Sequence, residues 1–260
     1  MAMLRFAANI SWLFQELAFL DRFAAARAAG FIAVEMRSPY EYPPQEVARR
    51  LRDNGLACVL FNLPMGDRDR GDFGLACRPF REAEFRAGVE KAIEYARVLE
   101  APRVNCIAGT IAPGEDRELL RDVLLENVRF AAEALGRAGV ELTMEPVNSI
   151  DVPNYFVPRN ADVVRVIEAA GAPGFGLQFD LYHTAMMGED LAASFDALLP
   201  RIRHIQFADA PGRGEPGTGQ SPIAPVLARI AASTYAGWVS AEYRPTCETL
   251  RTLAWMRATY

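Results

Sequence analysis

The stretch FGLQFDLYH, residues 175–183, is a short apolar run with aromatic residues, and an acid follows its last apolar residue. Comparable short runs, rich in β-branched and aromatic residues, begin near residues 4, 31, 56, 103, 141, 202 and 237, and they read LRFAANI, FIAVEM, LACVLFNL, RVNCIAG, ELTMEPV, IRHIQFAD and GWVSAEYRP. Such runs are typical of β-strands. The sequence therefore predicts eight strands spread along the whole chain.

Longer segments with helical periodicity lie between these runs. The spacing predicts helices over residues 13–29, 85–100 and 119–138. Glycines at positions 30, 55, 139 and 171 fall just past the ends of helical segments, where a left-handed C-cap is expected. The chain thus alternates strand and helix eight times.

This alternation favours a closed parallel barrel. The chain has 260 residues, and a (β/α)₈ barrel needs roughly 250. The competing doubly wound sheet requires a glycine-rich phosphate loop after the first strand, and the segment NISWLF contains no glycine. No linker or low-complexity tract divides the sequence. We therefore expect an α/β chain with one (β/α)₈ TIM-barrel domain over residues 1–260.

Composition excludes several classes of protein. The net charge of −5 is a poor match for non-specific nucleic-acid binding, which requires a basic surface. No stretch of 18 or more apolar residues occurs, so no membrane span is expected. The four cysteines form no CxxC pair, and the N-terminus lacks the pattern of a signal peptide. These features predict a cytoplasmic protein.

The distribution of acids and amides at strand ends points to a metal site. Four apolar strands are followed by Glu145, Asp180, Gln206 and Glu242. In a barrel the carboxyl ends of the strands meet at one mouth, where active sites lie. A single acid there is often a helix cap or an ion-pair partner, but four in consecutive strands are harder to explain that way. Three clustered carboxylates require a positive charge among them, and oxygen ligands suit Mg²⁺ or Mn²⁺, with Co²⁺ also compatible.

Several other side chains are candidates for substrate binding. His183 follows Asp180 by three residues and can contact substrate oxygens or a metal, whereas His204 is expected to be a buried, hydrogen-bonded histidine. Arg213 lies in the glycine-rich loop PGRGEPGTG and can clamp a carboxylate through two hydrogen bonds. The loops 64–83 and 210–222 follow strands and are candidate lids. Further pocket candidates are Glu35, Asn62, Asn148 and Asp151, which can line the pocket or orient its ligands.

These motifs together resemble the hydroxypyruvate isomerase family of the xylose-isomerase-like barrel superfamily. The matching stretches are RFAANISWLF, VEMRSPY, FNLPMGD, MEPVNSIDVPNY, QFDLYH, HIQFADAPGRGEPGTG and GWVSAEYRP, and they cover the chain from residue 4 to about residue 245. RGEPGTG and the EPVN…D stretch are the most discriminating. Two positions depart from the family pattern and bear on the substrate pocket: Phe61 stands where some relatives have histidine, and Arg37 lies in a segment that is more apolar in relatives.

The resemblance implies a function and roles for the site residues. It implies a divalent metal held by Glu145, Asp180, Gln206 and Glu242, with Glu145 and Glu242 also acting as the acid/base pair. His183 and Arg213 would contact substrate oxygens. The implied reaction interconverts hydroxypyruvate and tartronate semialdehyde by proton transfer through an enediolate. The expected partner is a small oxo-acid or sugar, and homo-oligomers are common among such barrels, although no surface patch identifies one.

Four alternatives remain open from the sequence. A ketose 3-epimerase or a 2-oxo-tetronate isomerase would use the same metal and the same two glutamates. A non-catalytic sugar-binding barrel would need no opposed glutamates. An abasic-site endonuclease is disfavoured, because such enzymes require a histidine-rich multi-zinc site and a basic groove, and this chain has two histidines.

Overall fold

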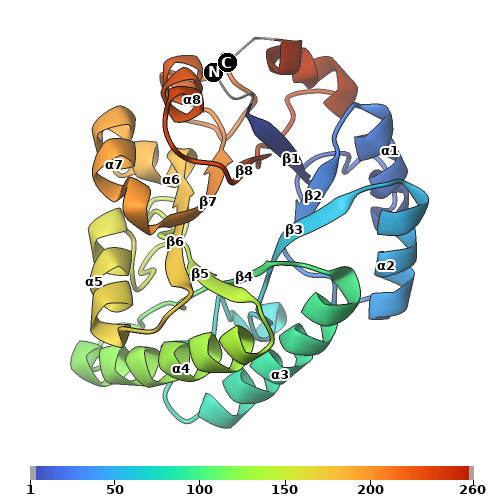
Figure 1. Cartoon of the computed structure of the whole chain (residues 1–260). Helices are drawn as coiled ribbons and strands as arrows, with labels where there is room; N and C mark the ends of the chain where they lie inside the picture. Colours follow the sequence, from blue (N-terminus) through green and yellow to red (C-terminus); the bar gives the residue numbers. More distant parts are fainter. Residues whose placement is uncertain (1–3, 258–260) are drawn as a thin grey trace.

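The computed structural model, which describes residues 4–257, is a closed barrel of parallel strands in sequence order (Figure 1). The strands are β1 (Arg5–Asn9), β2 (Ala33–Met36), β3 (Ala57–Asn62), β4 (Arg103–Cys106), β5 (Glu141–Met144), β6 (Phe175–Asp180), β7 (Ile202–Phe207) and β8 (Trp238–Ala241). Each strand pairs in parallel with the next, and β8 closes the ring on β1. The expected (β/α)₈ fold class is confirmed.

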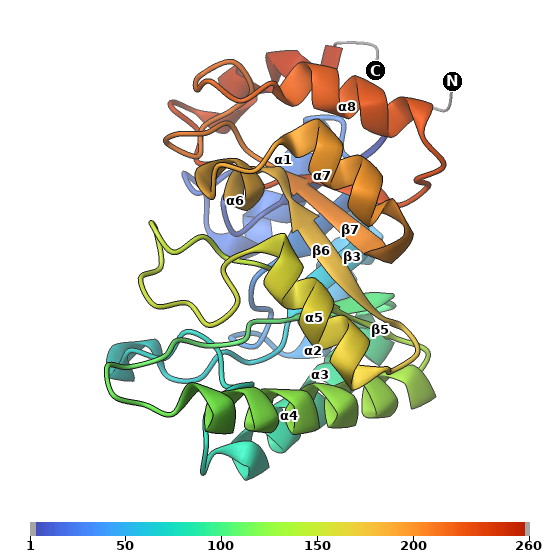
Figure 2. The same ribbon diagram turned by 90° about the vertical axis from the view of Figure 1, so that its left-hand side faces the viewer.

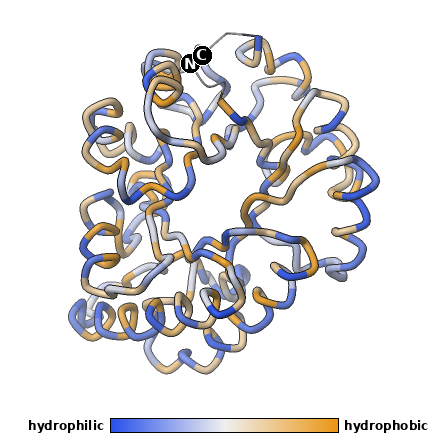
Figure 3. The backbone as a smooth tube through the Cα atoms, viewed as in Figure 1, coloured by the Kyte–Doolittle hydropathy of each residue, from blue (hydrophilic) through white to orange (hydrophobic). Residues whose placement is uncertain are grey.

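Helices surround the barrel and turn their apolar faces towards it (Figures 1 and 3). They are α1 (Arg22–Ala28), α2 (Pro44–Asp53), α3 (Glu82–Leu99), α4 (Arg117–Arg137), α5 (Asn160–Ala170), α6 (Leu181–Met186), α7 (Leu191–Leu198) and α8 (Ile223–Ala232), with 3₁₀ helices η1 (Phe19–Asp21), η2 (Arg68–Arg70), η3 (Leu199–Arg201) and η4 (Thr249–Arg257). The four glycines expected after helices all have positive φ angles, so that prediction is confirmed. Within residues 4–257, no helix is both long enough and apolar enough to cross a bilayer.

The helix expected over residues 13–29 is only partly correct, because residues 13–18 form turns. The backbone N–H of Phe14 donates to Thr249 Oγ1 at 2.8 Å, and Phe14 has a φ of 60° that no helix accommodates. The carboxylate of Glu16 also accepts from the Thr249 backbone at 3.0 Å. Contacts with the C-terminal segment thus override the local helical propensity.

The barrel interior changes from apolar to polar along its axis. Ala7, Ala33, Val59 and Trp238 form an apolar cluster together with Leu60, which lies further along β3 and reaches the cavity. Successive inward positions are two residues apart, so the next layer contains Asn9 after Ala7 and Glu35 after Ala33. The interior is therefore apolar at its base and polar towards the strand ends.

Long loops gather at the carboxyl ends of the strands, on the left side of Figure 2. Residues 63–81 connect β3 to α3, and residues 208–222 connect β7 to α8, close to the two long connections expected. Residues 107–116 and 145–159 form two more long connections. These loops surround the polar end of the barrel, which is the end where active sites of such barrels lie.

Candidate active site

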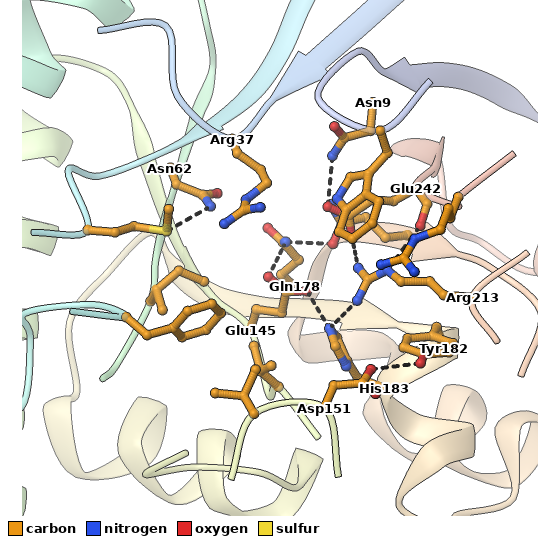
Figure 4. A pocket seen from close by; sticks show the side chains of 18 of the residues that line it. Asn9, Arg37, Asn62, Glu145, Asp151, Gln178, Tyr182, His183, Arg213 and Glu242 are labelled. Carbon is orange, nitrogen blue, oxygen red and sulfur yellow. Dashed lines mark hydrogen bonds and ion pairs between the residues drawn. The ribbon is translucent and has the colours of Figure 1, made fainter. Parts of the chain in front are cut away.

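A cavity of about 490 Å³ opens at the polar end of the barrel (Figure 4). Glu145, Gln206 and Glu242 line it, and Trp12 and Phe73 contribute aromatic surface. The volume falls in the lower part of the range of small-molecule sites. The cavity therefore contains three of the four predicted metal ligands, and Asp180 lies beside it.

The carboxylates come from neighbouring strands of one half of the barrel. Glu145 directly follows β5, Asp180 ends β6 and Glu242 directly follows β8, and all three are at most 5% exposed. His183 Nε2 lies 3.5 Å from both Glu145 Oε1 and Asp180 Oδ2. The Arg213 guanidinium lies 2.5 Å from Glu242 Oε2 and 3.6 Å from Asp180 Oδ2. The strand-end acids predicted from the sequence thus meet in one cluster.

Burial and mutual repulsion raise the pKa of each of these carboxyls. The pKa of Glu145 lies well above its usual value because of burial, followed by the charges of Glu242 and Asp180. Burial raises the pKa of Asp180, although Arg213 opposes the effect. Burial raises the pKa of Glu242 to about 8 against the opposing effect of Arg213. One arginine therefore does not compensate the whole cluster.

Arg213 lies deeper in the site than a solvated loop residue would. Its guanidinium is sandwiched between two aromatic rings, 4.7 Å from the centroid of Trp12 and 4.8 Å from that of Tyr182. Its Nη1 also lies 3.1 Å from His183 Nε2. The sequence predicts that Arg213 clamps a substrate carboxylate, and here the same guanidinium pairs with Glu242.

Hydrogen bonds from Asn148 fix the state of the His183 ring. Its Nδ1 faces the backbone N–H of Asn148 at 3.3 Å and the side-chain amide nitrogen of Asn148 at 2.7 Å. The amide orientation is set because Asn148 Oδ1 accepts from the backbone of Ile150 and Asp151. Burial, followed by the charge of Arg213, lowers the pKa of His183 well below its usual value. A neutral ring that accepts at Nδ1 bears its proton on Nε2, which can then donate to a substrate oxygen.

The donor set fits a divalent cation. Asp180 Oδ2 is buried and has no hydrogen-bond partner within the described residues, although it points into the acid cluster. Carboxylate oxygens of Glu145 and Asp180 lie within 4.8 Å of each other and of a His183 ring nitrogen, and with Nε2 protonated the two carboxylates are the ligands of this group. Three ionised carboxylates and one guanidinium leave a charge of −3 + 1 = −2. A hard dication with oxygen ligands neutralises that charge and satisfies the orphaned oxygen.

A second polar layer lies beneath the acids and contains Glu35, which does not line the cavity. Its carboxylate is fully buried and accepts from Asn9 at 2.8 Å and Gln206 at 2.6 Å. Burial alone would raise the pKa of Glu35, but the nearby His204 and the hydrogen bonds it receives lower it. His204 is buried and hydrogen-bonded to Glu35, as predicted. This layer holds the amide of Gln206, whose oxygen also accepts from Gln178 at 2.7 Å.

The sequence reasoning missed several residues of the site. Asn9 donates to both Glu35 and Glu242 at 2.8 Å. Asn105 and Gln178 donate to Glu145 Oε2 at 3.3 and 3.1 Å. Each is an amide on the inward face of a strand, and the two-residue alternation of strands would have placed them there. Of the predicted substrate contacts, His183, Arg213 and Asn62 line the cavity, whereas Asn148 lies behind His183.

Comparison with known proteins gives consistent relatives. Residues 23–259 match the protein family described as xylose isomerase-like TIM barrel. The chain is 40% identical to a hydroxypyruvate isomerase of Escherichia coli, with 98% of each chain covered. It is 42% identical to a 2-oxo-tetronate isomerase of Cupriavidus necator, with 97% of each covered. A crystal structure from Brucella melitensis, named AP endonuclease, family 2, superposes with a TM-score of 0.95 at 36% identity and covers 98% of both chains.

Proposed function

Since this chain belongs to the xylose isomerase-like TIM barrel family, among relatives that include hydroxypyruvate and 2-oxo-tetronate isomerases, we propose that it interconverts hydroxypyruvate and tartronate semialdehyde. The protein is an isomerase of the aldose–ketose type. The observation that supports this reaction is the cluster of three acids at the cavity: Glu145 and Glu242 line it, and Asp180 lies beside it with a carboxylate oxygen that has no hydrogen-bond partner among the described residues.

The two glutamates are placed to move the proton. Glu145 and Glu242 follow strands β5 and β8 and line the same cavity, so a small substrate between them can contact both. One glutamate removes a proton from the hydroxymethyl carbon of hydroxypyruvate, which leaves an enediolate. A proton is then delivered to the former carbonyl carbon by the other glutamate, or by the same one, and the hydroxyl proton changes oxygen. General acid–base catalysis of this kind contributes roughly 10²–10⁴-fold.

We assign the remaining polar groups to charge and orientation. A divalent cation, Mg²⁺ or Mn²⁺, held by Glu145, Asp180, Gln206 and Glu242 would supply a Lewis acid that stabilises negative charge on the substrate oxygens. His183 donates from Nε2 to a substrate oxygen, in the neutral state that Asn148 imposes. Asn9 and Gln178 hold the glutamate carboxylates by hydrogen bonds, so the acids need not reorganise during the reaction.

The deciding experiment is a turnover assay with hydroxypyruvate. The protein is treated with EDTA, assayed, and assayed again after Mg²⁺ or Mn²⁺ is restored. We expect loss of hydroxypyruvate and appearance of tartronate semialdehyde only with the metal. Turnover of 2-oxo-tetronate without turnover of hydroxypyruvate would move the substrate to the longer acid. Turnover of free ketoses alone would favour a 3-epimerase, and metal binding without turnover of any of these compounds would favour a non-catalytic barrel.

The site does not support an abasic-site endonuclease activity, despite the name of the Brucella structure. The chain contains two histidines. One of them, His204, is fully buried against Glu35, outside the residues that line the cavity. A histidine-rich multi-zinc site therefore lacks its ligands, and the net charge of −5 disfavours a DNA groove.

A further inference from the structure

Arg37 is a partly buried arginine of the cavity that, in the described part of the chain, lacks the kind of ion pair that Arg213 forms. It directly follows β2 and lines the cavity, and its guanidinium points inwards (Figure 4). Within residues 4–257 the guanidinium forms no ion pair and no hydrogen bond, although the side chain is partly buried. Arg213, in contrast, is paired with Glu242. Partial removal of a guanidinium from water without a partner has a free-energy cost, which an anionic ligand would reduce.

The backbone holds Arg37 firmly in this position. Its N–H donates to Ser11 Oγ at 2.8 Å, and its carbonyl accepts from the backbone N–H of Asn62 at 3.3 Å. The loop after β1 and the end of β3 therefore support it from both sides. Burial lowers the pKa of Arg37; the charge of Glu242 opposes this shift, the charges of Arg68 and Arg213 add to it, and Glu145 opposes it more weakly than Glu242 does.

A second under-used donor lies beside Arg37. The Asn62 side-chain oxygen accepts from Asn105 at 3.2 Å, whereas its amide nitrogen has the sulfur of Met65 at 3.8 Å as its acceptor. Sulfur is a weak acceptor, so this N–H remains available to a ligand. Figure 4 shows Arg37 and Asn62 directed into the cavity, and they come from the ends of the neighbouring strands β2 and β3. A planar anion between them would receive hydrogen bonds from both.

The proposal follows from this polarised cavity and rests on the proposed function. We propose that Arg37, with Asn62, is the specificity-determining anion subsite that binds the carboxylate of an oxo-acid substrate. The substrate then spans the cavity, with its carboxylate on the β2–β3 side and its reacting carbons at Glu145 and Glu242. Arg213 is left to its pairing with Glu242 instead of clamping the carboxylate. The subsite selects acids over neutral sugars, which would leave Arg37 unpaired.

The test measures kinetics and binding on the metal-loaded protein. The variant Arg37→Met removes the charge at similar length, and Arg37→Lys keeps it without the planar fork. For R37M we expect kcat/KM for hydroxypyruvate to fall roughly 30- to 150-fold, mostly through KM, which corresponds to a lost charged hydrogen bond. The affinity for D-glycerate, a non-reacting carboxylate, falls by the same factor. R37K recovers part of the loss in kcat/KM and in D-glycerate affinity, and Mn²⁺ affinity does not fall in either variant.

The matched control is Arg70→Met, which removes an exposed arginine that pairs with Asp67 on the nearby 3₁₀ helix η2. It should leave kcat/KM for hydroxypyruvate, the affinity for D-glycerate and the affinity for Mn²⁺ unchanged. The proposal is overturned if R37M binds D-glycerate like the wild type, or if its defect is a loss of Mn²⁺ affinity or of kcat alone. If the wild type fails to turn over hydroxypyruvate but its D-glycerate binding depends on Arg37, the subsite stands and the proposed reaction fails.

Discussion

The two halves of the barrel mouth are built from different side chains. Strands β1–β4, the first half, present mainly amides, and their single inward acid, Glu35, has a lowered pKa because His204 and hydrogen bonds compensate its burial. Strands β5–β8, the second half, end in Glu145, Asp180 and Glu242, whose pKa values are all raised. The acid of the first half is compensated by protein groups, so that half is left with the guanidinium of Arg37, unpaired within the described residues, whereas the second half has an excess of negative charge. This difference supports the proposal that the second half binds the cation and transfers the proton, and that the first half recognises the substrate.

Hydrogen bonds join the two halves. Asn9 of β1 donates to Glu242, and Asn105 of β4 donates to Glu145, so each outer strand of the first half supports a glutamate of the second. Arg213 is sandwiched between Trp12, which follows β1, and Tyr182, which follows β6. The glutamates are therefore held in place by neutral amides, which fix their geometry without neutralising their charge, and Arg213 compensates only part of that charge.

The largest effect should come from removing an acid of the second half. Glu145→Gln or Glu242→Gln should lower turnover of hydroxypyruvate by roughly 10²–10⁴-fold, because each change deletes a proton-transfer group. The double variant should be little worse than either single one, since the two residues act as a unit. Burial and neighbouring acids raise the pKa of Glu145, so its ionised form is unfavourable in the folded chain, and E145Q should unfold at the same or a higher temperature.

The control for this experiment is Glu133→Gln, which alters an exposed glutamate on α4. Calorimetry and a steady-state assay are enough to compare the variants. Near-normal turnover in E145Q or E242Q would remove that residue from the mechanism. A marked loss of stability in E145Q would contradict the inference that the ionised form of Glu145 is unfavourable in the folded chain.

A smaller effect is expected on metal-dependent stability. Asp180→Asn keeps the helix cap, because the remaining oxygen can still accept from the Tyr182 backbone, but it removes an ionised metal ligand. Mn²⁺ at about 100 times its Kd should stabilise the wild type by about 2.7 kcal/mol, and D180N should lose most of that gain. Differential scanning fluorimetry with and without Mn²⁺ measures it. Asp122→Asn, which alters an exposed residue, should retain the wild-type shift, and a full shift in D180N would exclude Asp180 as a ligand.

The second half was predictable from sequence for a simple reason. Each of its acids directly follows an apolar strand, and the barrel rule brings strand ends to one mouth. The first half gave a weaker signal. Asn9 and Asn105 are amides whose role depends on the acids opposite them, and those partners are 233 and 40 residues away in the sequence. Only the closed barrel identifies which acid each amide supports.

The sequence also did not predict how deep in the barrel each inward side chain lies. Glu35 and Asn62 both fall near strand ends and were expected to contact substrate, yet Asn62 lines the cavity and Glu35 lies below it. The stagger of neighbouring strands decides which inward residue reaches the surface. Likewise, residues 13–18 form turns because Thr249, far along the chain, binds their backbone and side chains. Long-range contacts thus set the details that local patterns leave open.

The third prediction tests whether the first half requires a neutral side chain at position 9, by placing a carboxylate there as in the second half. Asn9→Asp replaces the amide that donates to Glu35 and Glu242 with a carboxylate about as close to both. We expect a loss of about 2–5 kcal/mol in the free energy of unfolding at neutral pH, because a buried charge is added and two bonds are lost. The new acid would have a raised pKa in the folded chain, so the loss relative to wild type should grow as pH rises.

Urea unfolding at two pH values would measure this, with Gln220→Glu as a control that adds a charge at an exposed position. Equal destabilisation at low and high pH would mean that lost packing, and not charge, causes the defect. In that case the first half would tolerate a buried charge at position 9, and the electrostatic difference between the two halves would be smaller than the pKa directions indicate.

The smallest effect should come from the aromatic residue that the first half contributes to Arg213. Trp12→Leu removes one of the two aromatic rings that contact the Arg213 guanidinium. The lost cation–π interaction is worth about 1 kcal/mol, which corresponds to roughly a fivefold fall in kcat/KM. Trp12→Phe keeps a ring and should lose less. The change should be seen for every substrate, whereas a defect in the Arg37 subsite should be selective for acids. If W12L discriminated between acids and neutral sugars as strongly as R37M, Arg213 would share in binding the carboxylate, and recognition would extend across both halves of the mouth.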